Sequence, residues 1–228
     1  MSAGPLPGGG GRAWLLALGY GLTLGLVDTA VQRGLLGHPE SVVARLSTNL
    51  WVLTSAPVPW RALPSLLGSA LLTEDGTGWH WLPFVVVGLV PAARVLGARA
   101  AAATMVAVHL LATLVSQGVL AWRIDHDLAS GTQRLVSDVG PSYVVVAALA
   151  LVVADPLVGL RGARWWRAGC AAALVVLAPS LLDGLTTWQV APLGHLSAVV
   201  LVLALVAGRR VRARRAREAA PSPGSLPG

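Results

Sequence analysis

Two hydrophobic segments of this chain each begin with a side chain that could take part in covalent chemistry. Ser142 lies at the start of one segment, in Asp138-Val-Gly-Pro-Ser-Tyr143, and His195 lies at the start of another, in Pro192-Leu-Gly-His-Leu-Ser197. A serine becomes an effective nucleophile when a histidine takes its proton, because neither group is reactive enough alone. The spacing therefore raises the hypothesis of a serine and histidine pair on two facing helices.

The composition indicates where such a pair would have to work. The chain of 228 residues is 55% hydrophobic and only 12% charged, with a mean hydropathy of +0.69. This is too apolar for a soluble domain, and the apolar runs are continuous rather than alternating, which favours membrane-spanning helices over a barrel. The one cysteine, Cys170, lies inside such a run and has no partner for an intramolecular disulfide. The sequence therefore predicts an integral, all-α membrane protein.

Six apolar runs are candidates for membrane-spanning helices. We expect them at about 13–31, 79–96, 100–121, 140–155, 166–183 and 192–208. An even number of spans places both ends of the chain on one side of the membrane. All 17 basic residues are arginines, and 12 of them fall on the terminal side against 5 on the other. Because positive charge favours the cytoplasm, we predict that both termini are cytoplasmic.

The connection at about 32–78 is the longest, and it is not plainly polar. Within residues 41–51 the apolar side chains recur at the spacing of one helix face. We expect this segment to lie in the outer leaflet as part of a membrane-associated first loop that is interrupted further on by prolines. A seven-span arrangement, in which 62–73 belongs to an extra helix, is the alternative, and it would remove the arginine asymmetry.

The two candidate side chains should lie at similar depth in the membrane. With the amino terminus inside, the spans 140–155 and 192–208 both run inward, so Ser142 and His195 both lie near the outer surface. Gly140 lets a neighbouring backbone approach, and the first turn after it carries N–H groups without helical partners. Such groups could hold the charged oxygen of a tetrahedral intermediate. Alone, however, a Gly-Pro-Ser at the start of a membrane helix is more typical of packing or capping.

The order of these elements resembles that of the rhomboid intramembrane serine proteases. That family has six helices, a large membrane-associated first loop, a Gly-x-Ser at the start of the fourth helix and a histidine at the start of the sixth. Residues 140–142 match the Gly-x-Ser motif, and His195 matches the histidine. The segment 91–97 is similar to the end of the family's second helix. The resemblance covers about 40–210 and implies that Ser142 is the nucleophile and His195 the general base.

The chain departs from the family pattern at positions that bear on activity. Glycine usually follows the nucleophile, and here Tyr143 stands in its place. The family's second helix normally offers His-x-x-x-Asn to the oxyanion; His80 is present, but Phe84 follows four residues later and the one asparagine is Asn49. The resemblance implies supporting roles for Gly140 and His80 beside the oxyanion. The departures leave a catalytically inactive form open.

Three functions remain open from the sequence. The resemblance implies a divergent bacterial rhomboid-like protein of the cell membrane, a serine endopeptidase with a Ser-His dyad acting on single-span membrane proteins. The second is an inactive rhomboid-like protein that binds transmembrane helices as clients. The third is a small transporter, suggested by His109 and its polar neighbours in the third span, although an interhelical hydrogen bond is the simpler interpretation. We expect no cofactor and no metal.

The chain ends differ in composition from the spans. We expect a disordered N-terminal tail at 1–12, a rhomboid-like membrane domain at 13–208, and a tail at 209–228 that is first basic and then disordered. Six arginines crowd between positions 209 and 217, directly after a span. This position favours an anchor that faces the anionic headgroups of the lipid bilayer over binding to nucleic acid.

Overall fold

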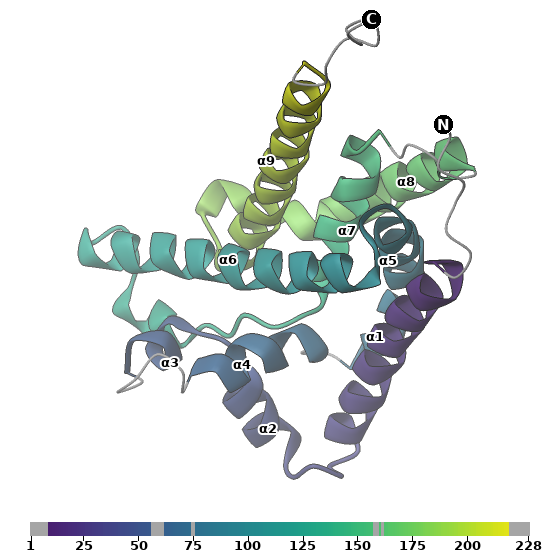
Figure 1. The fold of residues 1–228 in the computed structure, drawn as a ribbon. Coiled ribbons are helices and arrows are strands. Elements are labelled where there is room, and N and C mark those ends of the chain that lie inside the picture. Colours follow the sequence, from purple (N-terminus) through teal and green to yellow (C-terminus); the bar gives the residue numbers. More distant parts are fainter. Residues whose placement is uncertain (1–8, 56–61, 74–75, 157–159, 161, 219–228) are drawn as a thin grey trace, which may run out of the picture.

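The computed structural model describes residues 9–55, 62–73, 76–156, 160 and 162–218. Within these ranges the regular structure is helical, apart from an isolated antiparallel bridge between Thr48 and Asp138. The predicted all-α fold is therefore confirmed. The body of the molecule consists of α1 (Gly9–Gln32), α5 (Leu82–Leu96), α6 (Ala98–Asp125), α7 (Ser142–Ala154), α8 (Ala163–Leu182) and α9 (Val190–Glu218). The first loop carries α2 (Pro39–Leu46), α3 (Leu50–Ser55) and α4 (Leu63–Gly68) (Figure 1).

Each predicted span corresponds to a helix of the body. Five of these helical stretches are long and apolar enough to cross a bilayer, whereas the predicted span 140–155 forms the shorter α7 of 13 residues. The reasons are local: Gly140 has a φ of +132°, which a helix cannot include, and Pro141 caps the first turn. At the other end the backbone becomes extended at Asp155. The chain is a multi-pass membrane protein in which α7, at the position of the fourth predicted span, is short.

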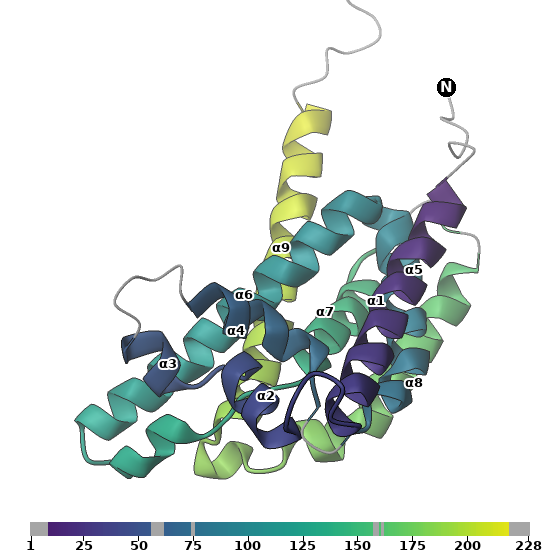
Figure 2. The same ribbon diagram turned by 90° about the horizontal axis from the view of Figure 1, so that it is seen from below.

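The short helix α7 lies among the other helices and is almost fully enclosed by them. Ten of its 13 residues are buried, and it packs against α5, α6, α8 and α9. The close approach of α5 depends on Gly88, where a Cβ atom would lie only 3.1 Å from the Cβ of Ala148. Figure 2 shows α7 in the interior, between α9 and α5. Because α7 is shielded by protein, its side chains form the centre of the apolar core.

Arginines gather at the C-terminal end of α7. Arg209 of α9 pairs with the Asp155 carboxylate at 3.0 Å, and Arg167 of α8 donates to the Asp155 carbonyl at 2.7 Å. Arg210 of α9 donates to the carbonyl of Ala154. The last carbonyls of a helix lack intrahelical donors and carry partial negative charge, so cations are favourable there. Two neighbouring helices thus fix this end of α7.

The first loop is broken into short pieces rather than forming one amphipathic helix. The helical pattern of 41–51 correctly predicts α2, but α2 ends at Leu46, because Thr48 is extended and pairs with Asp138 through both backbone groups, at 2.6 and 3.2 Å. The seven-span alternative is wrong, since residues 62–73 form only the six-residue α4 and a 3-10 turn, far short of the about 20 residues that a span needs.

The carboxylate of Asp28 ties α1 to the connection after α4. Asp28 is 1% exposed and accepts hydrogen bonds from the N–H and hydroxyl of Thr73, at 3.1 and 2.7 Å, and from the N–H of Gly78 at 3.0 Å. Three donors offset the cost of burying one charge. They fix the start of η3, the 3-10 turn Gly78–Trp81 that leads into α5.

The helices continue further toward the chain ends than the hydrophobic pattern predicts. α1 begins at Gly9 rather than at 13, and α9 continues past 208 to Glu218. At about 1.5 Å per residue, its 29 residues extend about 43 Å, more than a hydrocarbon core of about 30 Å. The N-terminal end of α1 and the C-terminal end of α9 both point away from α2, α3 and α4 (Figure 1). Residues 9–12 of the predicted disordered tail 1–12 are helical, whereas residues 1–8 and 219–228 lie outside the described part of the chain.

Candidate functional site

Ser142 is the first residue of α7 and is half-buried. The turn before it is fixed, because the N–H of Gly140 donates to the carbonyl of Ser69 at 2.8 Å. The first backbone hydrogen bond of α7 runs from the N–H of Val145 to the carbonyl of Pro141. The N–H groups of residues 142–144 therefore have no acceptor within the helix. They belong to Ser142 itself and to the two residues that follow it.

His195 lies in the second turn of α9 and is only 7% exposed. Its Nδ1 atom lies 2.7 Å from the carbonyl oxygen of Leu181, so Nδ1 carries the proton and donates it. In the neutral ring Nε2 is then the acceptor, and it is buried without a hydrogen-bond partner among the described residues. The fold thus fixes the tautomer of His195 and leaves a basic lone pair available on Nε2.

The side chain that packs against His195 is that of Tyr143, not that of Ser142. The two ring centroids lie 5.1 Å apart at an interplanar angle of 78°, an edge-to-face contact. Since Nε2 of His195 has no partner in the described part of the chain, the conformation contains no hydrogen bond from Ser142 to this atom. Helices α7 and α9 do face each other as predicted, but the tyrosine occupies the contact.

Tyr143 is held tightly in this position. It is 2% exposed, and its hydroxyl lies 3.0 and 2.9 Å from the two carboxylate oxygens of Asp138, to which it donates. On α9, Gly194 makes room for the ring, because a Cβ atom there would overlap the tyrosine hydroxyl. From the sequence, Tyr143 stands out only as a departure from a family pattern, and its pairing with Asp138 is not predicted. The combination of a glycine directly before His195 and a tyrosine directly after Ser142 is the signal that could have revealed the contact.

A second histidine lies on the other side of Tyr143. His109 of α6 is 3% exposed, and its ring centroid lies 5.8 Å from that of Tyr143. Its Nε2 donates to the carbonyl of Leu66 at 2.9 Å and lies 3.2 Å from the hydroxyl of Ser69, both in the first loop. The predicted interhelical hydrogen bond is confirmed. This bond explains why His109 is buried in a span, and His109 is the residue on which the transporter hypothesis depended.

One face of α6 beside this histidine is unusually polar for a buried surface. Thr113, Ser116 and Gln117 follow His109 at helical spacing and are all buried. The Nδ1 of His109, the Thr113 hydroxyl and both polar atoms of the Gln117 side chain have no partner among the described residues. Buried polar atoms normally have partners, so this face suits water molecules or another small polar group.

The structure does not bring His80 to this group of residues. His80 lies on η3, where its side chain is exposed and where the turn packs against α1 and α5. Within the described residues no hydrogen bond or ring contact joins it to Ser142 or His195. Gly140, by contrast, stands two residues before Ser142 and shapes the start of α7. The expected oxyanion role of His80 therefore stays a prediction without a supporting contact.

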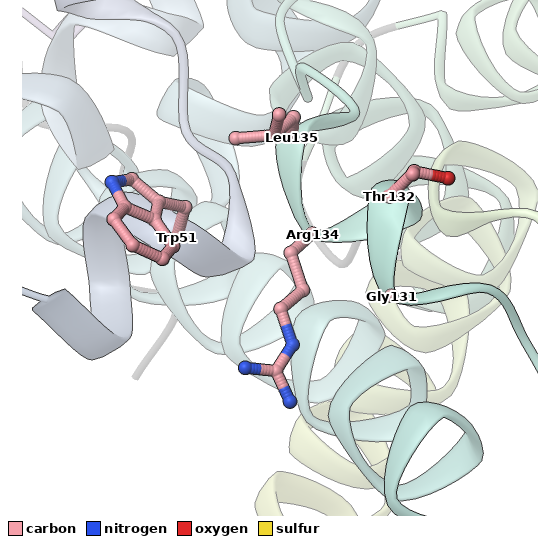
Figure 3. Close-up of a pocket in the computed structure, with 5 residues that line it drawn as sticks. All are labelled: Trp51, Gly131, Thr132, Arg134 and Leu135. Atoms are coloured by element: carbon pink, nitrogen blue, oxygen red, sulfur yellow. The ribbon is translucent and has the colours of Figure 1, made fainter. Parts of the chain in front are cut away.

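A shallow surface hollow in the described part of the chain lies elsewhere. It is lined by Trp51 of α3 and by Gly131, Thr132, Arg134 and Leu135 of η4, the 3-10 segment Gly131–Leu135 after α6 (Figure 3). Arg134 lies 3.6 Å from the exposed carboxylate of Asp125, so this group is a solvated ion pair beside apolar side chains. In the described ranges no three His, Cys, Asp or Glu side chains gather closely enough to hold a metal ion.

Comparison with known proteins bears on the whole arrangement. The model of a family described as rhomboid-like protein matches residues 20–215, which include most of α1 and all of α5 to α8, together with nearly all of α9. No curated protein and no solved structure matches the chain.

Proposed function

This chain belongs to the family of rhomboid-like proteins, and from that membership we propose that it is an intramembrane serine endopeptidase with Ser142 as nucleophile and His195 as general base. The observation that carries the proposal is the state of His195. Its Nδ1 proton is committed to the Leu181 carbonyl at 2.7 Å, and its Nε2 is buried without a partner in the described residues. A fixed tautomer with an available lone pair is what a general base needs.

The reaction would proceed by acyl transfer. The oxygen of Ser142 bonds to the carbonyl carbon of a peptide bond while its proton passes to Nε2 of His195, and the free N–H groups in the first turn of α7 hold the negative oxygen. The carbon–nitrogen bond then breaks, and the leaving amine takes the proton from Nε2. A water molecule attacks the resulting ester in the same way, which releases a carboxylic acid and restores Ser142.

Hydrolysis in a membrane also requires water near the ester. The buried face of α6 that carries His109, Thr113 and Gln117 offers polar atoms that have no partners among the described residues, and it lies beside Tyr143. Water molecules held there would have two to four hydrogen-bond partners each, as buried water usually does. This face supports the proposal because it would supply the second substrate of the reaction.

We propose further that the site lies near the outer face of a bacterial cell membrane and that both termini are cytoplasmic. Arg167, Arg209 and Arg210 all contact the end of α7 that is opposite to Ser142, and positively charged residues favour the cytoplasmic face. The expected substrates are therefore single-span membrane proteins cut near their outer end. The remaining arginines of α9 would face anionic lipid headgroups.

The orientation can be tested by labelling with an impermeant maleimide. A cysteine introduced by Ser130→Cys, in the connection after α6, should react in intact cells, whereas one introduced by Ser225→Cys should react only after lysis. The native Cys170 is buried, so it contributes little background. The reverse pattern would place Ser142 and His195 at the cytoplasmic face.

Catalysis can be tested with a fluorophosphonate probe, which forms a covalent bond with an activated serine. The purified chain in detergent should be labelled, and Ser142→Ala should abolish labelling. Ser180→Ala is the matched control, because Ser180 on α8 is exposed and its hydroxyl donates to the carbonyl of Leu177 in the same helix. Absence of labelling under conditions that label an active rhomboid protease would contradict the proposal.

A second function is favoured by one specific observation, the packing of Tyr143 against His195. If this contact is permanent, Ser142 never reaches Nε2, and the protein binds transmembrane helices without cutting them. In that case a Ser142→Ala copy should fully rescue any cellular phenotype caused by deleting the protein. Failure of this copy to rescue, with the wild-type copy rescuing, would rule the inactive form out.

A further inference from the structure

In the present conformation of α7, Tyr143 lies against His195, and no hydrogen bond joins Ser142 to Nε2 of that ring. Successive residues of an α-helix point about 100° apart around its axis. The structure gives the position beside His195 to Tyr143, whose ring makes the edge contact at 5.1 Å. The reaction proposed above needs Ser142 in that position instead. A change at the start of α7 must therefore separate the closed arrangement from a reactive one.

The closed arrangement is held by a chain of contacts that leads to the first loop. The Tyr143 hydroxyl donates to the carboxylate of Asp138, which is 6% exposed. The backbone of Asp138 in turn exchanges two hydrogen bonds with Thr48, at 2.6 and 3.2 Å. The Thr48 hydroxyl donates to the carbonyl of Ser65 at 3.0 Å, in α4. The tyrosine is thus linked through one aspartate to Thr48, in the segment after α2, and from there to α4.

The geometry at both ends of this contact permits movement. Gly140 and Pro141 separate Asp138 from α7, and the positive φ of Gly140 means that the helix does not continue through this point. On α9, Gly194 leaves space that the tyrosine ring fills. The hydroxyl of the ring bonds to the Asp138 carboxylate and also to the Ser116 side chain, so release by Asp138 would leave one hydrogen bond and packing contacts to keep the ring beside His195.

We propose that Tyr143 and Asp138 are gating residues of the Ser142 and His195 site: the tyrosine ring, held by Asp138, excludes Ser142 from Nε2 of His195 until the first loop moves. The assignment rests on the proposed peptidase function. A segment that binds the first loop and displaces Thr48 would release Asp138, and the tyrosine ring would then leave the position that Ser142 must take. The gate thereby couples substrate binding at the loop to formation of the catalytic pair.

The gate can be tested without catalysis by measuring how accessible position 142 is. Ser142→Cys in a Cys170→Ala background gives a chain with a single thiol, whose alkylation rate by N-ethylmaleimide reports opening. Tyr143→Phe removes the hydroxyl but keeps the ring, and Asp138→Asn removes the charge that the hydroxyl binds. A hydrogen bond to a charged group contributes enough that each change should raise the alkylation rate about tenfold.

The chain offers a matched control, since Tyr20 is its only other tyrosine. The Tyr20 hydroxyl donates to the Ala70 carbonyl at 2.8 Å, away from His195, so Tyr20→Phe should leave the alkylation rate within about twofold. Thermal unfolding shows whether each variant is folded. If Tyr143→Phe does not fold, Asp138→Asn alone tests the gate. An unchanged or lower alkylation rate in the folded gate variants would overturn the gate.

Fluorophosphonate labelling of the chains that keep Ser142 separates the gate from the peptidase proposal. If both hold, Tyr143→Phe should be labelled about tenfold faster than wild type. Faster alkylation without labelling of any chain would support the gate and refute the peptidase. Labelling of wild type with no change in alkylation would support the peptidase and refute the gate.

Discussion

The two ends of α7 are held in different ways. At its C-terminal end, arginines from α8 and α9 bind the last carbonyls and pair with Asp155 at 3.0 Å. At its N-terminal end, the helix is preceded by Gly140 and Pro141, and its principal side-chain contact is one tyrosine between two histidines. Charge fixes the first end, whereas the second is held by backbone hydrogen bonds to the first loop and by the contact of the Tyr143 hydroxyl with Asp138. The comparison suggests that α7 is anchored at one membrane face and adjustable at the other.

The largest effect should follow from removing the proposed base, His195, at the N-terminal end of α7. His195→Ala should lower the rate of fluorophosphonate labelling by at least about 1,000-fold, because the serine then has no proton acceptor. His126→Ala is the control, since His126 caps the C-terminal end of α6, is exposed, and among the described residues contacts Trp122 of that helix. A labelling rate for His195→Ala within tenfold of wild type would show that another group takes the proton.

The next effect concerns the space that the tyrosine fills. Gly194→Ala should lower the free energy of unfolding by about 1–3 kcal/mol, since its Cβ atom would overlap the Tyr143 hydroxyl. Gly208→Ala, at a helical position with open space around it, should be neutral or slightly stabilising. Thermal unfolding in detergent measures both.

A second substitution tests the cause of that loss. Tyr143→Ala in the Gly194→Ala chain removes the overlapping atoms, so the double variant should lose less stability than the sum of the single variants. Equal losses for Gly194→Ala and Gly208→Ala would mean that the tyrosine does not occupy this position in the folded protein.

At the anchored end the expected effect is smaller, because Arg209 is 39% exposed although Asp155 is only 8% exposed. Asp155→Asn and Arg209→Gln should each lower the free energy of unfolding by about 1–2 kcal/mol, and the double variant should lose less than the sum. Fluorophosphonate labelling should stay within about twofold of wild type. A large loss of labelling would show that the two ends of α7 are coupled rather than independent.

The smallest effect should come from an ion pair at the surface. Asp125 and Arg134 lie 3.6 Å apart with side chains 67% and 43% exposed. Asp125→Asn should change the free energy of unfolding by less than about 0.5 kcal/mol, because water and salt screen such pairs. A loss as large as that of Asp155→Asn would mean that the connection after α6 is more structured than its exposure indicates.

Much of the fold could be predicted because its cause is local. Runs of apolar residues longer than about 17 predict spans directly, and all the predicted spans are helices in the structure. The ends of the helices were less predictable. The arginines after 208 have high helix propensity, so α9 continues through them, although hydropathy predicts that the span ends there. In the first loop, pairing of Thr48 with a residue 90 positions away interrupts a helix that its own sequence favours.

What the sequence by itself determined about this protein is its class, its helices and the two segments that carry Ser142 and His195. These follow from composition, hydropathy and a short motif, all of which act over neighbouring residues. Only the tertiary structure decided which side chain meets His195. The choice between Ser142 and Tyr143 depends on the rotation of α7 against α9, and that rotation is fixed by Asp138, Gly194 and the first loop, which are remote in the chain. Contacts among remote residues form only when the helices pack, so no local pattern could reveal them.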